Sequence, residues 1–251
     1  MTGRVTERDG QQIRAADQKD ALYAYFVIGL QGLEFSHSVT KPDQGRQRIA
    51  HLMNPATRYA IVSLNYDMIL ESICAQLTRV FDVDRPIEFE RDNYLQDWSK
   101  PMLFKLHGSV DDDSIVAPTW AKGMDQKNVQ VWRNAFKVIE NTNHLRFVGF
   151  SMPPSDAYVQ FLFKSAILNA KHLKSIEAIC LDGDGSVKQR YDSLITFKNY
   201  AFKTSSFSHL RRHFGDFKVV QKESNLFASM DLESCHKAFM RADHGEKPED
   251  A

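Results

Sequence analysis

The sequence lacks an excess of charge of either sign, because its 251 residues include 32 Lys and Arg and 32 Asp and Glu. A balanced charge creates no field that would draw the protein to nucleic acid or to an acidic membrane surface, so we expect neither partner. The chain also lacks any apolar run near the roughly 20 residues that span a bilayer. Its first residues, MTGRVTERDGQQ, lack the apolar core of a signal peptide. We therefore expect a soluble, cytoplasmic protein.

Cysteine is scarce as well. Cys74, Cys180 and Cys235 lie far apart in the sequence, and no two of them form a CxxC pair. This spacing excludes a zinc ribbon built from this chain and favours a reduced compartment, so we predict no metal site. What the chain does have is length and apolar content, with 17 Phe among its residues, enough to bury a sizeable core.

The most informative stretch is YAIVSLNYDMILESI, from Tyr59 to Ile73. Residues 59–64 form an apolar run with β-branched side chains, which predicts a buried strand. Asn65, Tyr66 and Asp67 interrupt the run, and apolar residues then recur at helical spacing, with Asp67 placed to cap the helix. We interpret the stretch as a strand, a polar elbow and a helix.

The same alternation of strand and helix continues along the chain and predicts an α/β protein with a Rossmann-like parallel sheet and helices on both faces. The main expected strands are 59–64, 102–106, 145–150 and 175–181, and the helices between and after them are 68–79, 128–140, 157–170 and 187–194. Before them we expect a helix over 11–31, a loop over 34–45 and a short helix over 46–53. Weaker signals indicate short strands at 86–89 and 114–117, an edge strand at 196–204, a helix at 205–213, a strand at 217–221 and a helix at 232–241. We divide the chain into a frayed N-terminus (1–10), one α/β domain (11–213), a C-terminal extension (214–242) and a disordered tail (243–251).

Polar clusters follow four of the expected strands. They are Asn65 and Asp67, His107–Ser109, Ser151–Asp156 and Asp182–Gly185. Ligands bind at the carboxyl ends of the strands in open parallel sheets, so the clusters are expected to meet at one edge. Each cluster alone also has an ordinary explanation as a turn or a helix cap. The convergence of all four is what indicates a site.

These four clusters, in this order, resemble the sirtuin-like family. The resemblance rests on SLNYD at 63–67, KLHG at 105–108, GFSM at 149–152 and LDG at 181–183. The motifs NYD, LHGS and VGFSMPPSD resemble those of the bacterial sirtuin-like NAD hydrolases of antiphage defence more closely than those of the deacetylases. The resemblance covers roughly residues 59–210.

The resemblance implies NAD as the substrate, bound with its nicotinamide ribose between Asn65 and His107. It implies that Asn65 orients the ribose and water, that Asp67 supports the elbow, and that His107 acts as the general base, a role that suits a side chain titrating near neutrality. Residues implied to contact the cofactor are Ser63, Tyr66, Gly108, Gly149, Ser151, Met152, Asp182 and Gly183. Ser151 would contact phosphate or ribose, and Asp182 the adenosine ribose.

The chain departs from the family in two ways. No glycine-rich turn of the kind that holds a pyrophosphate precedes Asn65, and Gly29 and Gly32 are too sparse to form one. Either the N-terminus is shortened, or another chain supplies the element, or nucleotide binding has been lost. The family's zinc cysteines are also absent, which speaks against protein deacylation. The function classes left open are NAD hydrolysis, a non-catalytic nucleotide-sensing or assembly module with a homo-oligomeric or other partner, and, with least support, deacylation.

Overall fold

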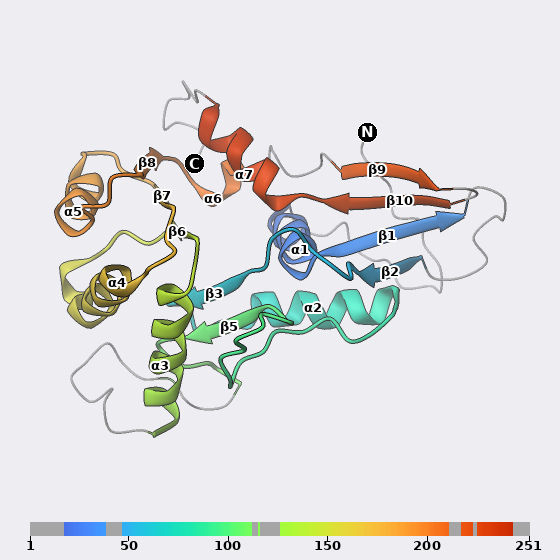
Figure 1. Ribbon diagram of the computed structural model, residues 1–251, viewed down its shortest axis with the longest axis horizontal. Coiled ribbons are helices and arrows are strands. Elements are labelled where there is room, and N and C mark those ends of the chain that lie inside the picture. Colours follow the sequence, from blue (N-terminus) through green and yellow to red (C-terminus); the bar gives the residue numbers. More distant parts are fainter. Residues whose placement is uncertain are drawn as a thin grey trace.

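The computed structural model describes residues 18–38, 47–111, 115, 126–210, 217–222 and 225–242. The described strands are β1 (Leu33–Ser38), β2 (Arg48–His51), β3 (Ala60–Ser63), β4 (Asp82–Val83), β5 (Met102–Lys105), β6 (His144–Val148), β7 (Ser175–Cys180), β8 (Tyr200–Thr204), β9 (Phe217–Lys222) and β10 (Asn225–Met230). The described α-helices are α1 (Gln18–Gln31), α2 (Ile69–Val80), α3 (Gln126–Glu140), α4 (Ala157–Asn169), α5 (Ser186–Leu194), α6 (Phe207–Leu210) and α7 (Leu232–Arg241) (Figure 1). The strands form three sheets, with orders β4-β2-β1-β10-β9, β3-β5 and β6-β7-β8.

The expected α/β architecture is confirmed in the middle of the chain. β3 pairs with β5 in parallel, and β7 pairs in parallel with both β6 and β8. The structure places α2 after β3, α4 after β6 and α5 after β7, as the sequence predicts. The expected edge strand is β8, which pairs with β7 alone among the described strands.

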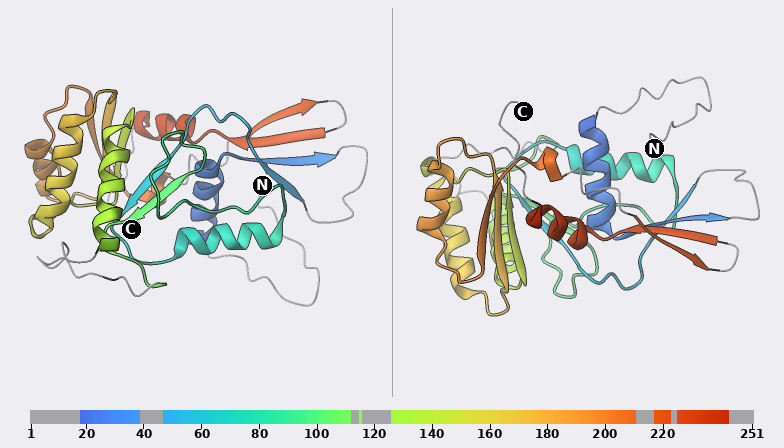
Figure 2. Two further views of the ribbon diagram at one scale, coloured as in Figure 1. Left: turned by 60° about the horizontal axis from the view of Figure 1, so that its bottom comes forward. Right: turned by 90° about the horizontal axis from the view of Figure 1, so that it is seen from above.

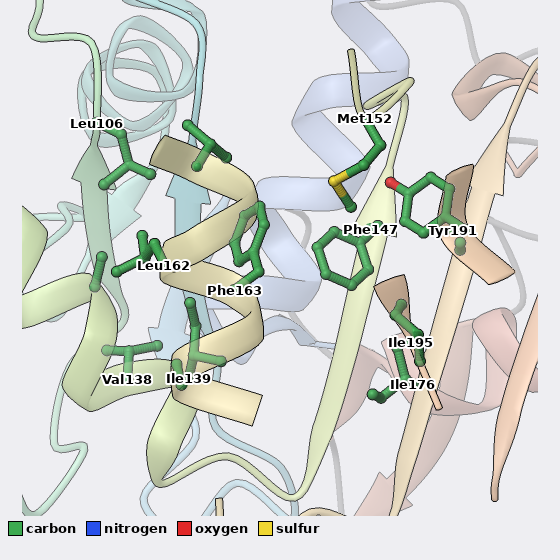
Figure 3. Close-up of a cluster of buried hydrophobic side chains, with 14 of the residues drawn as sticks. Leu106, Val138, Ile139, Phe147, Met152, Leu162, Phe163, Ile176, Tyr191 and Ile195 are labelled. Atoms are coloured by element: carbon green, nitrogen blue, oxygen red, sulfur yellow. The ribbon is translucent and has the colours of Figure 1, made fainter. Parts of the chain in front are cut away.

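Helices cover both faces of these parallel strands, as expected, because alternate strand residues point into different cores. On β5, Leu103 belongs to a hydrophobic cluster with residues of α1, α2 and α7, whereas Phe104 belongs to one with residues of α3, α4 and α5. β7 divides in the same way, with Ile179 in the first cluster and Ala178 in the second. Figure 3 shows part of the second cluster. In it, Phe147 packs edge-on against Phe163, with ring centroids 4.9 Å apart.

The N-terminal predictions need two corrections. Residues 34–38, expected in a loop, lie in β1, and residues 48–51, expected in a helix, form β2. Both segments were misassigned because they are short and polar, and their strand state depends on pairing with each other and with more distant segments. Leu33 and Ile49, which are almost fully buried, provide the apolar positions of these half-buried strands.

Two further predictions fail or fall outside the described residues. Residues 86–89 are not a strand, although Ile87 and Phe89 are buried, and the nearby pairing is a bridge between Glu90 and Met102. The expected strand at 114–117 lies outside the described residues except for Ile115. Residues 1–17 and 243–251, and therefore the expected frayed N-terminus and disordered tail, also lie outside them.

The end of the chain pairs with its beginning. β10 is antiparallel to β1, with Phe35 opposite Ala228, and β9 adds to the other edge of β10. The sequence indicated β9 but not β10. As Figure 2 shows, β1, β2, β9 and β10 extend away from the parallel strands as a separate layer. The segment that we expected as a C-terminal extension is therefore hydrogen-bonded to the N-terminal strand.

A polar cluster attaches α7 to the parallel strands. The Arg146 guanidinium donates to both oxygens of Glu233, at 2.6 and 2.8 Å, and its Nε donates to Glu177 at 3.0 Å. The buried His236 ring lies 2.7 Å from Glu177, and the Tyr59 hydroxyl donates to Glu233 at 3.3 Å. These partly buried charges join β6, β7 and α7 to the residue that precedes β3.

The cluster predicts a loss of stability in acid. Burial raises the pKa of Glu177, but the hydrogen bonds and charges of His236 and Arg146 outweigh burial and lower it from 4.5 to about 2. A carboxyl whose pKa is lower in the folded than in the unfolded protein stabilises the fold at pH values above its pKa in the unfolded chain. This stabilisation is lost as the pH falls through its pKa in the folded protein. We expect unfolding free energy measured by urea denaturation to fall by roughly 3 kcal/mol between pH 4.5 and 2 from this group. The Glu177→Gln variant should lose less stability over that range, and an equal loss in both proteins would contradict the assignment.

Candidate functional site

The elbow after β3 is held by its own side chains. The Ser63 hydroxyl accepts from the backbone N–H of Asn65 at 3.1 Å, which closes a tight turn. The Asp67 carboxylate accepts from the backbone N–H of Ile69, the first residue of α2, at 3.1 Å, although the N-cap position itself is Met68. Asn65 and Tyr66 are exposed, so their side chains are accessible at the end of the strand.

The histidine loop after β5 turns through a glycine. Gly108 has φ +81°, a left-handed conformation that glycine adopts without a steric cost, and its N–H donates to the carbonyl of Lys105 at 3.2 Å. His107 is only 5% exposed. The ring therefore lies below the surface, where stray water is largely excluded.

The two loops occupy equivalent positions on neighbouring strands. Ser63 is opposite Lys105 in the parallel register, so Asn65 and His107 each lie two residues beyond a paired residue. Pairing continues past the strand ends, because the Leu106 N–H donates to the Ser63 carbonyl at 2.9 Å and the Val110 N–H to the Tyr66 carbonyl at 3.1 Å. The structure thus places the two residues at the centre of the expected site in the loops that follow neighbouring strands.

The Lys105 side chain contacts residues of both loops, which the sequence did not predict. Its ammonium donates to the Asp67 carbonyl and, at 3.1 Å, to the Ser109 hydroxyl, and it lies 2.7 Å from a Glu71 oxygen. The contact with Glu71 is an ion pair by distance, but its angles do not meet hydrogen-bond geometry. The signal in the sequence was a lysine within the apolar run MLFKL, where a cation needs a buried partner.

The ion pairs extend outward from Lys105. Arg91 lies 3.9 Å from Glu71 and donates to both oxygens of Asp111, at 2.6 and 3.0 Å. Hydrogen bonds from Arg91 and Ser109 hold the pKa of Asp111 well below its ordinary value. The first carboxylate of the acidic run at 111–113 is therefore paired, while Asp112 and Asp113 lie outside the described residues.

We expect Lys105→Met to destabilise the protein by about 3 kcal/mol or more, because it leaves the buried Glu71 oxygens with only the more distant Arg91, 3.9 Å away. Urea denaturation measures the loss. Removing both charges in Lys105→Met/Glu71→Met should restore most of the lost stability, since no uncompensated charge is then buried. If the double variant is as unstable as the single one, the pair does not hold these elements together. Lys100→Met, at an exposed pair with Glu88, is the matched control and should cost less than about 1 kcal/mol.

The other two clusters are also in register. Val148 is opposite Ile179, so Ser151 and Asp182 each lie three residues beyond a paired residue. The Gly149 N–H donates to the Ile179 carbonyl at 2.8 Å, and Gly149 has φ +72°. Ser151 is exposed. These residues form a second pair of adjacent loops, on a different sheet from the first.

Two of the residues predicted to contact the cofactor also stabilise the fold. The two Asp182 oxygens accept from the backbone N–H groups of Val187 and Lys188, at 3.2 and 2.9 Å, and so cap the start of α5. Met152 is 1% exposed and belongs to the hydrophobic core, with φ +53°. A nucleotide contact by Met152 would therefore come from its backbone, and one by Asp182 would share oxygens already engaged.

Open space lies over this second pair of loops. A Cβ built on Gly149 or Gly183 would meet no atom within 4 Å. By contrast, a Cβ built on Gly29 would lie 3.2 Å from the Leu232 side chain, and Gly32 has φ +61° just after α1 ends, so these two glycines serve packing and helix termination. Among the described residues, no atom crowds Gly149 or Gly183, and no glycine-rich pyrophosphate loop is present.

Two cavities lie away from this rim. One, of about 790 Å³, is an apolar groove between α3 and α4, and the other, of about 590 Å³, is lined by residues of 30–32, 51–59 and 84–101. None of the predicted site residues lines either one. Among the described residues, no cluster of three His, Cys, Asp or Glu side chains could hold a metal. Burial raises the pKa of the Cys74 thiol to about 12, so this thiol stays protonated near neutral pH. None of the helices in the described part of the chain has the length and apolar character needed to cross a bilayer.

Parallel strands, helices on both faces and paired polar loops at the carboxyl ends define an α/β protein of the kind that binds ligands along that edge. Comparison with protein families identifies which one. A model described as SIR2-like domain matches residues 59–204, more than half of the chain, and the chain belongs to this family. The family binds NAD, and the matched range contains both pairs of loops. No curated protein and no solved structure gives a significant match.

Proposed function

We propose that the protein hydrolyses the nicotinamide glycosidic bond of NAD, releasing nicotinamide and ADP-ribose. The observation that carries the proposal is the shared register of Asn65 and His107 on β3 and β5, within a SIR2-like domain. Depletion of NAD in antiphage defence is the biological role that the resemblance to bacterial sirtuin-like hydrolases adds to this proposal.

The chemistry requires charge stabilisation and a base. The bond from the ribose C1′ to the pyridinium nitrogen breaks, and nicotinamide leaves with the bonding electrons while positive charge develops on the ribose. Asn65 orients the ribose and the attacking water. His107 accepts a proton as water adds to C1′, and its low exposure limits competing water. Asp67 holds the elbow through its bond to Ile69 and places a carboxylate near the developing cation.

The remaining contacts involve both pairs of loops. Ser63, Tyr66 and Gly108 would line the nicotinamide ribose. On the neighbouring sheet, Gly149, Ser151 and the Met152 backbone would contact phosphate or ribose, with Asp182 and Gly183 near the adenosine ribose. The space above Gly149 and Gly183 is consistent with this arrangement.

Release of nicotinamide from NAD by the purified chain, followed by chromatography, tests the proposal. We expect release that depends on Asn65 and His107. Absence of release, together with no thermal shift from NAD or ADP-ribose, would refute both catalysis and binding. An acetyl-lysine peptide as co-substrate separates hydrolysis from deacylation, since hydrolysis needs no peptide.

A second candidate is a non-catalytic module that binds a nucleotide or a partner domain. It is favoured by the lack of a glycine-rich pyrophosphate loop among the described residues and by the use of both Asp182 oxygens as a helix cap. A thermal shift with ADP-ribose and no nicotinamide release would identify this function.

A further inference from the structure

A second polar cavity lies at the end of β3 and β5 that is opposite the rim. It is the cavity of about 590 Å³, a volume typical of small-molecule sites. The two strands are parallel and point the same way in Figure 1, so Tyr59 and Pro101, which line the cavity, precede the strands, whereas Asn65 and His107 follow them. Any ligand held there would be separate from the proposed NAD site.

The lining of this cavity comes from described parts of the chain that meet at one place. The end of α1 contributes Leu30–Gly32, whereas α1 begins at Gln18, about 20 Å away along the helix axis. Leu33 pairs with His51 beside the cavity, whereas β1 ends at Ser38, about 16 Å further along the strand. The ends of these described segments therefore lie away from the cavity.

Two of the cations that line the cavity are already neutralised. The His51 ring nitrogen Nδ1 lies 2.9 Å from an Asp84 oxygen, which also accepts from the His51 backbone N–H at 3.1 Å. Burial raises the pKa of Asp84, but the hydrogen bonds from His51 outweigh burial and lower it, so the carboxylate stays charged. Lys100 donates to Glu88 at 2.6 Å. These two pairs leave no net charge of either sign.

Two further cations, Arg58 and Arg85, carry the excess charge of the cavity lining. Among the described residues, neither guanidinium has a carboxylate within ion-pair distance. Arg58 donates to the backbone carbonyl of Asp97, which fixes it beside the residue that precedes Trp98. Guanidinium groups bind phosphate and carboxylate with paired, charge-assisted hydrogen bonds. The unpaired charge therefore favours an anionic ligand.

Trp98 gives the cavity an aromatic wall. Its φ of +49° is uncommon for a bulky residue, and strain of this kind persists where the surrounding structure enforces it, most often at ligand sites. The half-buried indole packs against the second hydrophobic cluster, and its N–H has no hydrogen-bond partner among the described residues. Pro55, Pro86 and Pro101 add apolar surface to the lining. A planar ring in the ligand would stack on this wall.

We propose that this cavity binds a mononucleotide, with its base against Trp98 and its phosphate on Arg58 and Arg85. The ribose favours a nucleotide over a simple aromatic acid. Asp84 and Glu88 each use one oxygen for their cation, and the second oxygen of each has no partner among the described residues. Those oxygens can accept hydrogen bonds from ribose hydroxyls. The inference does not rest on the proposed function, since it involves other residues.

Calorimetric titration of the full chain with adenosine 5′-monophosphate (AMP) tests the proposal. We expect Arg58→Ala and Arg85→Ala each to weaken AMP binding at least about 10-fold, because each removes a charge-assisted hydrogen bond. Trp98→Gly should weaken it at least about 5-fold through lost stacking, while glycine adopts the positive φ without strain. Adenosine and inorganic phosphate should each bind at least about 10-fold more weakly than AMP, since each lacks half of the recognised groups.

The control and the contrary results are equally specific. Arg79→Ala removes an exposed arginine of α2 that does not line the cavity, and should leave AMP affinity unchanged. Absence of AMP binding would overturn the proposal. So would equal AMP affinity in the wild type and the three cavity variants, which would place AMP elsewhere, for example at the rim. Nicotinamide release is a separate measurement, so hydrolysis can fail while the cavity still binds AMP.

Discussion

Replacing His107 with alanine is expected to lower kcat for nicotinamide release by about 100-fold or more, the usual contribution of a general base. The KM for NAD should change little, because the lost interaction forms mainly in the transition state. Steady-state release of nicotinamide measures both constants. His107 is buried, so a thermal melt of the variant must first show that the fold is retained.

The partner residue gives a sharper form of this test. Asn65→Ala should also lower kcat, and because Asn65 and His107 would act on one ribose, the double variant should be little worse than the worse single variant. Fully multiplicative losses would contradict joint action. His172→Ala, at an exposed histidine, is the matched control and should retain wild-type activity.

Replacing Arg146 with alanine is expected to lower the free energy of unfolding by about 3–5 kcal/mol. The guanidinium holds Glu233 through two hydrogen bonds and Glu177 through a third, and its removal leaves two partly buried carboxylates short of a cation. Because Glu233 lies on α7, we expect this helix to loosen first. Urea denaturation gives the free energy, and exchange of the α7 amides locates the change.

A surface pair provides the comparison for Arg146. Lys188 pairs with Asp192 at 2.5 Å across one helical turn, and both side chains are exposed. Lys188→Ala should cost only about 0.3–0.5 kcal/mol. Similar losses for Arg146→Ala and Lys188→Ala would show that the cluster around Arg146 does not fasten α7.

The candidate site was predictable from local patterns to a useful extent. The run before Asn65 and the run before His107 are short and apolar, so each indicates a strand followed by a polar turn, and both strands exist. The hydrogen bond from the first N–H of α2 to Asp67 follows from the position of this residue before a helical pattern. Lys105 was not predicted as part of the site, because its importance comes from Asp67, Glu71 and Ser109, which only folding brings to it.

The same difference between local patterns and long-range contacts explains which parts of the fold were predicted. Helices and parallel strands from β3 to α5, except the two-residue β4, were predicted because their apolar periodicity is strong and their neighbours follow in sequence. β1, β2 and β10 were not, since they are short, half-buried strands without a strong apolar pattern, and the pairing of β1 with β10, as of Phe35 with Ala228, joins segments far apart in the sequence. Polar residues at alternate positions resemble a loop until a partner strand supplies their hydrogen bonds.

The sequence by itself determined the α/β class, the loops that carry Asn65, His107, Ser151 and Asp182, and the likeness to sirtuins, since each depends on residue order alone. Tertiary structure decided which loops are neighbours, because register is a property of paired strands. The tertiary structure places the loop of Asn65 beside the loop of His107, and the loop of Ser151 beside the loop of Asp182. The two pairs of loops follow strands of separate hydrogen-bonded sheets.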